Sequence, residues 1–169
     1  LSSERIWLLR ISASSSPAHH ALVASNELKG FILTRHWRDL PEGTQIEYWL
    51  ATEAGPRKVV LTAQTSVAFV QARDRRAVEA QLALLPGLTV RELALTTFGR
   101  EPALGVYARH FRQLGKLARA LQAQQVPLYE ADVRPHDRYL MERFITAGVL
   151  VEGGREDGST IYDCRLKPA

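Results

Sequence analysis

The stretch GFILTRHWRDLPEGTQIEYWLAT, residues 30–52, determines how the chain begins to fold. β-Branched and aromatic residues dominate both of its halves, and the turn sequence Leu-Pro-Glu-Gly at 40–43 separates them. This pattern is typical of a β-hairpin. In the second half Ile46, Tyr48 and Leu50 alternate with polar or mixed positions, so one face of that strand is predicted to be buried.

A third strand-forming run, residues 58–62, follows the turn pair at 55–56. Residues 30–63 are therefore predicted to form a three-stranded β-meander, a barrel-like sheet at the start of the fold. Upstream, residues 1–29 contain a serine-rich stretch of turn composition, begin at leucine and show no periodicity. We interpret residues 1–29 as an extension or tail that is disordered in part.

Downstream of the meander the rhythm changes to alternating strand and helix patterns. Residues 66–72 have strand composition, and residues 73–85 and 112–125 carry apolar residues on one helical face and arginines on the other. Strand-like runs at 88–95, 103–111 and 127–132 complete the series. Residues 64–133 are thus predicted to be a β-α-β-β-α-β unit, the split βαβ arrangement of ferredoxin-like and RNA-recognition modules. The expected fold class is α+β.

A last segment, residues 134–169, is predicted to be a helix followed by a terminal hairpin. Pro135 suits the first position of a helix, and Asp137 suits the positive end of the helix dipole. The predicted apolar stripe of this helix is Tyr139, Leu140, Phe144 and Ile145. Glycine-containing turns then bracket the runs VLVEG and STIYDCRL, which we expect to pair as the hairpin.

Composition excludes several classes of protein. With 169 residues, of which 46% are hydrophobic, the chain can bury a core without a disulfide or a metal. The single cysteine, Cys164, forms no internal disulfide and is expected to be a small buried strand residue in a reducing compartment. No apolar run approaches the length of a membrane span, so no membrane partner is expected. A net charge of +4 is compatible with a polyanionic partner.

Two carboxylates, Glu130 and Asp132, stand two residues apart on the last predicted strand, where alternate side chains share a face. Such a pair can bind Mg²⁺ or Mn²⁺, but nothing nearby supplies the further acidic ligands of a metal nuclease. Arg134 and Arg138 lie within a few residues. We therefore expect these four residues to form structural ion pairs or a helix cap, and we assign no metal site and no catalytic residue.

Cations interleaved with aromatic residues suggest a nucleic-acid contact, although a solvated surface has a similar composition. The candidate DNA-binding residues are Arg35, His36, Trp37, Arg38, Arg109 and Arg138. An RNA-binding sheet of this type carries aromatics at alternate positions of its third strand. Those positions are read here as Val106 and Ala108, which predicts a poor stand-alone RNA reader.

Several segments together resemble the amino-terminal region of bacterial family B DNA polymerases. They are GFILTRHWRDLPEGTQIEYWLAT (30–52), SVAFV, YARHFRQL, YEADVRPHDRYLMERFI (129–145) and RLKP (165–168). The resemblance runs from Gly30 to Pro168. It implies a non-catalytic domain that contacts single-stranded template DNA and docks on an exonuclease domain.

The resemblance also implies what the parent enzyme does. A family B polymerase is a nucleotidyltransferase with 3′–5′ exonuclease activity that uses Mg²⁺ in replication, repair and translesion synthesis. Its partners would be template DNA, its own remaining domains and the sliding clamp, in the bacterial cytoplasm at the nucleoid. The fragment itself is expected to have no enzyme activity and to bind no cofactor.

Archaeal relatives carry a template-uracil pocket whose apolar residue and arginine match Val133 and Arg138, while Pro135 stands at the aromatic position. Uracil recognition therefore does not follow from the resemblance, whereas a template contact in this region does. The alternative interpretation of the chain is a free-standing ferredoxin-like module that binds nucleic acid or a small ligand.

Overall fold

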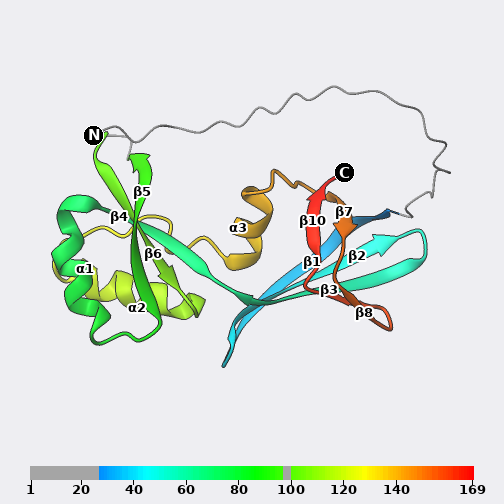
Figure 1. Ribbon diagram of the computed structural model, residues 1–169, viewed down its shortest axis with the longest axis horizontal. Coiled ribbons are helices and arrows are strands. Elements are labelled where there is room, and N and C mark those ends of the chain that lie inside the picture. The colour runs from blue at the N-terminus through cyan, green and yellow to red at the C-terminus, as the bar shows by residue number, and fades with distance from the viewer. Residues whose placement is uncertain (1–26, 97–99) are drawn as a thin grey trace, which may run out of the picture.

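The computed structural model describes residues 27–96 and 100–169 and places them in two sheets with helix α3 between them (Figure 1). Of the predicted extension 1–29, only the last three residues lie within the described part. None of the described helices is long and apolar enough to cross a membrane. The elements are β1 (Leu28–Leu40), β2 (Gly43–Thr52), β3 (Gly55–Gln64), β4 (Ser66–Gln71), η1 (Ala72–Asp74), α1 (Arg75–Leu82), β5 (Leu88–Thr96), β6 (Pro102–Ala108), α2 (Phe111–Gln122), α3 (Pro135–Met141), β7 (Gly148–Glu152), β8 (Arg155–Asp157), β9 (Thr160–Tyr162) and β10 (Arg165–Pro168).

The larger sheet has seven strands in the order β10-β7-β1-β2-β3-β9-β8. Strands β1, β2 and β3 pair antiparallel in sequence, so the predicted meander is confirmed. Strand β1 begins at Leu28, two residues earlier than predicted, because Leu28 and Lys29 already pair with β7. Strand β9 joins the free edge of β3 in parallel, which lengthens the meander into a curled sheet.

An irregularity in β1 decides which of its side chains face the core. The register passes from Ile32 opposite Leu50 directly to Thr34 opposite Trp49, so Leu33 is an extra, bulged residue. Directly opposed residues of an antiparallel pair share a face. After the bulge, the side chains of Arg35 and Trp37 therefore lie on the same face as the buried Tyr48 and Ile46.

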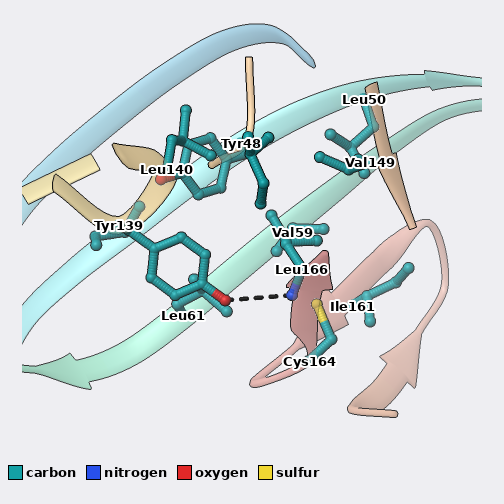
Figure 2. Packing of buried hydrophobic residues seen from close by; sticks show 12 residues of the cluster. Tyr48, Leu50, Val59, Leu61, Tyr139, Leu140, Val149, Ile161, Cys164 and Leu166 are labelled. Carbon is teal, nitrogen blue, oxygen red and sulfur yellow. Dashed lines mark hydrogen bonds between the residues drawn. The ribbon is translucent and has the colours of Figure 1, made fainter. Parts of the chain in front are cut away.

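Helix α3 covers this inner face of the large sheet and closes its core (Figure 2). The Tyr48 hydroxyl donates a hydrogen bond of 2.6 Å to the backbone oxygen of His136, which ties the helix to β2. The backbone N–H of Leu166 donates a hydrogen bond of 3.2 Å to the Tyr139 hydroxyl, which ties it to β10. The predicted burial of Ile46, Tyr48 and Leu50 is confirmed.

The smaller sheet has the order β4-β6-β5, with α1 and α2 packed on one face. Helix α2 buries Leu114, Leu117 and Leu121 on its predicted apolar stripe. The prediction of a fourth strand at 127–132 is wrong, because that segment contributes only an isolated bridge between Tyr129 and Phe69. The mixed α+β class is confirmed by the two sheets and their helices, while the second unit is a split βαβ arrangement with one strand missing.

The end of the chain departs from the prediction in two places. Helix α3 stops at Met141, and Phe144 adopts a φ of 56° with its side chain 87% exposed, so it does not belong to the apolar stripe as predicted. Strand β7 pairs with β1 and with β10, so the predicted pairing of VLVEG with STIYDCRL forms only at Arg165 and Leu166, the end of the second run. The hairpin forms between the short strands β8 and β9, around the turn at Gly158.

A polar joint connects the two sheets. The carboxylate of Asp39, near the end of β1, accepts hydrogen bonds from the Thr44 hydroxyl (2.6 Å) and from the backbone N–H groups of Phe111 (3.0 Å) and Arg112 (3.1 Å). A side chain of one sheet therefore caps the first turn of α2 on the other, where the helix has no local side-chain cap. The joint fixes the β1–β2 hairpin against α2.

Candidate nucleic-acid interface

A groove lies between the inner face of β1 and helix α3. Its volume is about 470 Å³ and its lining combines two cations, two carboxylates and an apolar floor. The lining residues are Arg35, Asp132, Val133, Arg134, Asp137, Leu140, Met141 and Ile145. The groove thus brings Arg35 from the predicted cluster on β1 together with the segment around Glu130 and Asp132 that the sequence had singled out.

The β1 cluster itself is divided between the two faces of the sheet. Arg35 and Trp37 point to the inner face, and an ion pair of 3.1 Å joins Arg35 to Asp137 of α3. His36 and Arg38 point to the outer face, where Arg38 pairs with Glu47 at 2.7 Å. The four residues therefore do not form one surface, because a strand sends alternate side chains to opposite faces.

The inner-face half of the cluster continues onto α2. The Trp37 ring meets Phe111 edge-on at 4.7 Å between centroids, and the Arg112 guanidinium lies 5.9 Å from the centre of the Trp37 ring. Arg35 lies two residues from Trp37 on the same face of β1, and Arg134 lines the groove together with Arg35. We call Arg35, Trp37, Arg112 and Arg134 the basic strip.

The sequence predicted that Arg109 and His110 lie on the strand before α2. Instead, both residues follow the end of β6. Arg109 donates from Nε to the backbone oxygen of Glu42 at 3.2 Å, and His110 Nε2 lies 2.7 Å from the backbone oxygen of Leu40. Both side chains thus hold the β1–β2 hairpin. Their contacts assign them to the joint between the sheets.

The prediction that Glu130 and Asp132 share a strand face is wrong, because Glu130 lies in a turn with a φ of 60°. Arg138 donates from Nη2 to Glu130 Oε2 at 2.9 Å and lies 3.8 Å from Glu142. Among the described residues, Asp132 and Arg134 form no ion pair. The same part of the chain has no group of three His, Cys, Asp or Glu side chains placed to hold a metal ion.

Arg138 also lines a small, partly open cavity between the two sheets, of about 70 Å³. Val133 and Pro135 contribute apolar walls, and Ser66 contributes a buried hydroxyl with no hydrogen-bond partner among the described residues. Val133, Pro135 and Arg138 are the positions that match the template-uracil pocket of archaeal relatives. They do come together here, around a cavity.

Burial shifts the titration of two side chains near these sites. Burial lowers the pKa of His136 from its ordinary value, and the neighbouring Asp137, whose Oδ1 lies 3.1 Å from His136 Nδ1, opposes that shift. Burial raises the pKa of the Cys164 thiol to about 11. Cys164 is buried as expected, although it lies in the link between β9 and β10 and not within a strand. A thiol that stays protonated is a poor nucleophile.

Two residues of the interface were missed from sequence. Arg112 was assigned to the polar face of a helix, and nothing in its local pattern indicates that Trp37 of a distant strand lies beneath it. The hairpin pattern around Asp39 does not indicate that its carboxylate caps a distant helix. The N-cap position of α2 is His110, which provides no side-chain cap, and this is the signal that could have indicated a capping residue elsewhere in the chain.

Two family models match adjacent parts of the chain. The model of the DNA polymerase II N-terminal domain matches residues 30–65, and the model of the DNA polymerase II insertion domain matches residues 66–126. The boundary between them falls between β3 and β4. The two models together cover the meander and most of the smaller sheet with its helices.

Individual relatives agree with these matches. The chain is 50% identical to DNA polymerase II of Escherichia coli (strain K12) over 139 residues, which are 82% of this chain and 18% of that protein. The solved structure of the family B DNA polymerase from the hyperthermophilic archaeon Pyrobaculum calidifontis superposes with a TM-score of 0.66 at 19% identity, over 83% of this chain and 21% of that chain. The chain therefore spans about a fifth of these relatives. It belongs to the DNA polymerase II family, of which it carries the N-terminal and insertion domains.

Proposed function

We propose that the chain is the non-catalytic amino-terminal part of a bacterial DNA polymerase II and contacts the single-stranded template. The basic strip carries this proposal. The Arg112 guanidinium lies over the Trp37 ring, and Arg35 shares the face of β1 that carries this ring. Arg134 extends the strip along the groove beside α3. Cations can neutralise successive phosphates of a strand while an aromatic ring stacks on a base.

Polymerase and exonuclease chemistry would then belong to other domains of the parent enzyme, together with the Mg²⁺ that this chemistry uses. DNA replication, repair and translesion synthesis would be roles of that whole protein in the bacterial cytoplasm, with the sliding clamp as a partner. The relation of this chain to the catalytic centres is to position the template and to dock on the exonuclease domain.

Exposed apolar side chains near the end of α3 support the docking part of the proposal. Met141, the last residue of α3, is 64% exposed, and Phe144, three residues later, is 87% exposed. Large apolar side chains clustered on a surface mark interaction sites. In the full-length polymerase, Phe144→Glu should weaken the association of the two domains, measured as increased protease cleavage between them, whereas Leu84→Glu, at another exposed apolar residue, should not.

The template contact is tested by titrating a fluorescent oligothymidylate at several salt concentrations. A few phosphate contacts predict a log–log salt slope on the order of −2 to −4. Arg35→Gln or Arg112→Gln should each reduce the magnitude of that slope by about 0.7, the share of one phosphate contact with a single strand.

Arg38 provides the matched control, because it lies on the same strand as Arg35, pairs with a carboxylate in the same way and faces the opposite side. Arg38→Gln should leave the slope unchanged. Equal effects of the Arg35 and Arg38 variants would show that binding depends on net charge alone. Salt-independent binding, or none at low salt, would remove the basis of the proposal.

A further inference from the structure

Within residues 27–96 and 100–169, no helix packs on the second face of the smaller sheet. Its inner face packs on α1 and α2 through buried residues such as Val106 and Ala108. Alternate residues point the other way, and the register places Phe69 opposite Gly105 and Tyr107 opposite Val67. Val106 and Ala108 face the helices, so the aromatic residues of the outer face stand at the alternate positions. We call Val67, Phe69, Arg91, Leu93, Gly105 and Tyr107 the open sheet face.

The ring of Tyr107 leans across this face above the backbone of β6. A Cβ atom added to Gly105 would lie only 2.8 Å from Tyr107 Cε2 and 2.8 Å from Leu93 Cδ1. The missing side chain of Gly105 is therefore what lets the tyrosine ring occupy that space. The Arg91 guanidinium lies 4.8 Å from the centre of the same ring. The result is an aromatic ring on the sheet surface with a cation beside its face.

A second aromatic ring repeats the arrangement on the neighbouring strand. Phe69 is the diagonal neighbour of Tyr107, which corresponds to a separation of roughly 7–8 Å between the two positions. The Arg138 guanidinium lies 5.7 Å from the centre of the Phe69 ring. Tyr129, bridged to Phe69 and 41% exposed, extends the same row. Rings at this spacing suit successive bases of an extended single strand.

We propose that the open sheet face is a second site for single-stranded DNA, where Phe69 and Tyr107 stack two successive unpaired bases. Arg91 and Arg138 would hold the flanking phosphates. Arg91 has to move off the Tyr107 ring to admit a base, and as an exposed side chain it is free to do so. Arg138 pairs with Glu130 at 2.9 Å, so a phosphate has to share Arg138 with that carboxylate or displace it.

This inference rests on the proposed function, since it gives the template a path beyond the basic strip. Arg138 links the two regions. It contacts Phe69 on the open sheet face, and it lines the small cavity together with Val133. Val133 in turn lines the groove beside α3. A protein partner could also use these half-buried aromatic rings. The cations beside both rings favour an anionic strand over an apolar partner surface.

The test uses the complete chain and a short fluorescent oligothymidylate. Tyr107→Leu and Phe69→Leu should each weaken binding about tenfold, because each removes a stacked base. The salt slope should stay unchanged, since no cation is lost. This distinguishes the open sheet face from the basic strip, where Arg35→Gln lowers the slope. Duplex DNA, whose bases are already stacked and paired, should bind the natural chain and the two variants equally.

Tyr162 supplies the matched control, because the Arg155 guanidinium lies 4.6 Å from its ring centre in the same cation–ring arrangement on the other sheet. Tyr162→Leu should leave affinity unchanged. If Tyr107→Leu behaves like Tyr162→Leu while the Arg35 effect persists, the inference is refuted and the template contact stands. If the natural chain binds no single strand, both fail.

Photocrosslinking avoids variants that fail to fold. An oligonucleotide containing 5-iododeoxyuridine, irradiated on the unmodified chain, should form covalent links to peptides containing Phe69 or Tyr107, identified by mass spectrometry. Links to the Trp37 peptide alone would confine the DNA to the basic strip and overturn the second site.

Discussion

Asp39 should contribute more to stability than any local pattern around it indicates. Its carboxylate accepts three hydrogen bonds, two of them from the first backbone N–H groups of α2. Asp39→Ala removes a helix cap, worth about 1 kcal/mol. It also removes a negative charge from the positive end of the helix dipole, worth about 0.5 kcal/mol, and the acceptor of a buried hydroxyl, worth about 1 kcal/mol.

The expected loss for Asp39→Ala is therefore about 2–3 kcal/mol. It is not larger, because the Phe111 N–H keeps a second acceptor in the Thr44 hydroxyl at 3.0 Å. For a domain of this size the loss corresponds to a decrease in melting temperature of roughly 5–10 °C. Asp39→Asn keeps an acceptor oxygen but loses the charge, so it should lie between the natural chain and the alanine variant.

Urea denaturation of the complete chain measures these differences, with Asp157→Ala as the control because Asp157 is an exposed aspartate in the short strand β8. Exposed substitutions of that kind change stability by about 0.5 kcal/mol at most. If Asp39→Ala is no more destabilising than Asp157→Ala, a cap reaching from one sheet to the other contributes nothing and the reasoning about the joint is wrong.

Two further predictions concern α3. Arg138→Ala should lower the free energy of unfolding by about 1–2 kcal/mol, because it breaks the 2.9 Å ion pair with the half-exposed Glu130 and the contact with Phe69. An unchanged melting curve with reduced DNA affinity would instead show that Arg138 serves DNA binding alone. His136 has a pKa below its ordinary 6.5 in the folded chain, so the unfolded chain binds that proton more readily. Stability should therefore be full above pH 6.5 and fall as the pH drops from there toward the folded pKa, and urea midpoints for His136→Gln should lack that part of the decrease.

Regular periodicity was enough to predict most of the elements, because burial of one face leaves a repeating signal in the sequence. The alternation of Ile46, Tyr48 and Leu50 indicated the buried face of β2, and the spacing of Leu114, Leu117 and Leu121 indicated that of α2. In both elements the apolar side chains that face the core recur at the period of the strand or helix. This repeat can be recognised from the residues of the element alone, without knowledge of its neighbours.

Features that depend on a single irregular residue could not be predicted in this way. The bulge at Leu33 reverses which residues of β1 face the core, so the cluster from Arg35 to Arg38 is divided by one extra residue that has no distinctive composition. Glu130, with a φ of 60°, similarly ends what had the composition of a strand. Residues other than glycine rarely adopt a positive φ, so the identity of residue 130 as a glutamate gave no indication of the turn.

The two proposed DNA contacts depend on the joint at Asp39 for their relative position. The basic strip combines Trp37 of the large sheet with Arg112 of α2, and α2 packs on the sheet that carries Phe69 and Tyr107. Asp39 lies two residues after Trp37 on the same face of β1, and it binds the backbone of Arg112 itself. A variant that loosens this joint without unfolding either sheet should therefore weaken binding of a long single strand that spans both regions. A strand too short to reach both should bind almost as before, because each region keeps its own side chains. If long and short strands lose affinity equally, the two contacts act independently and the joint serves stability alone.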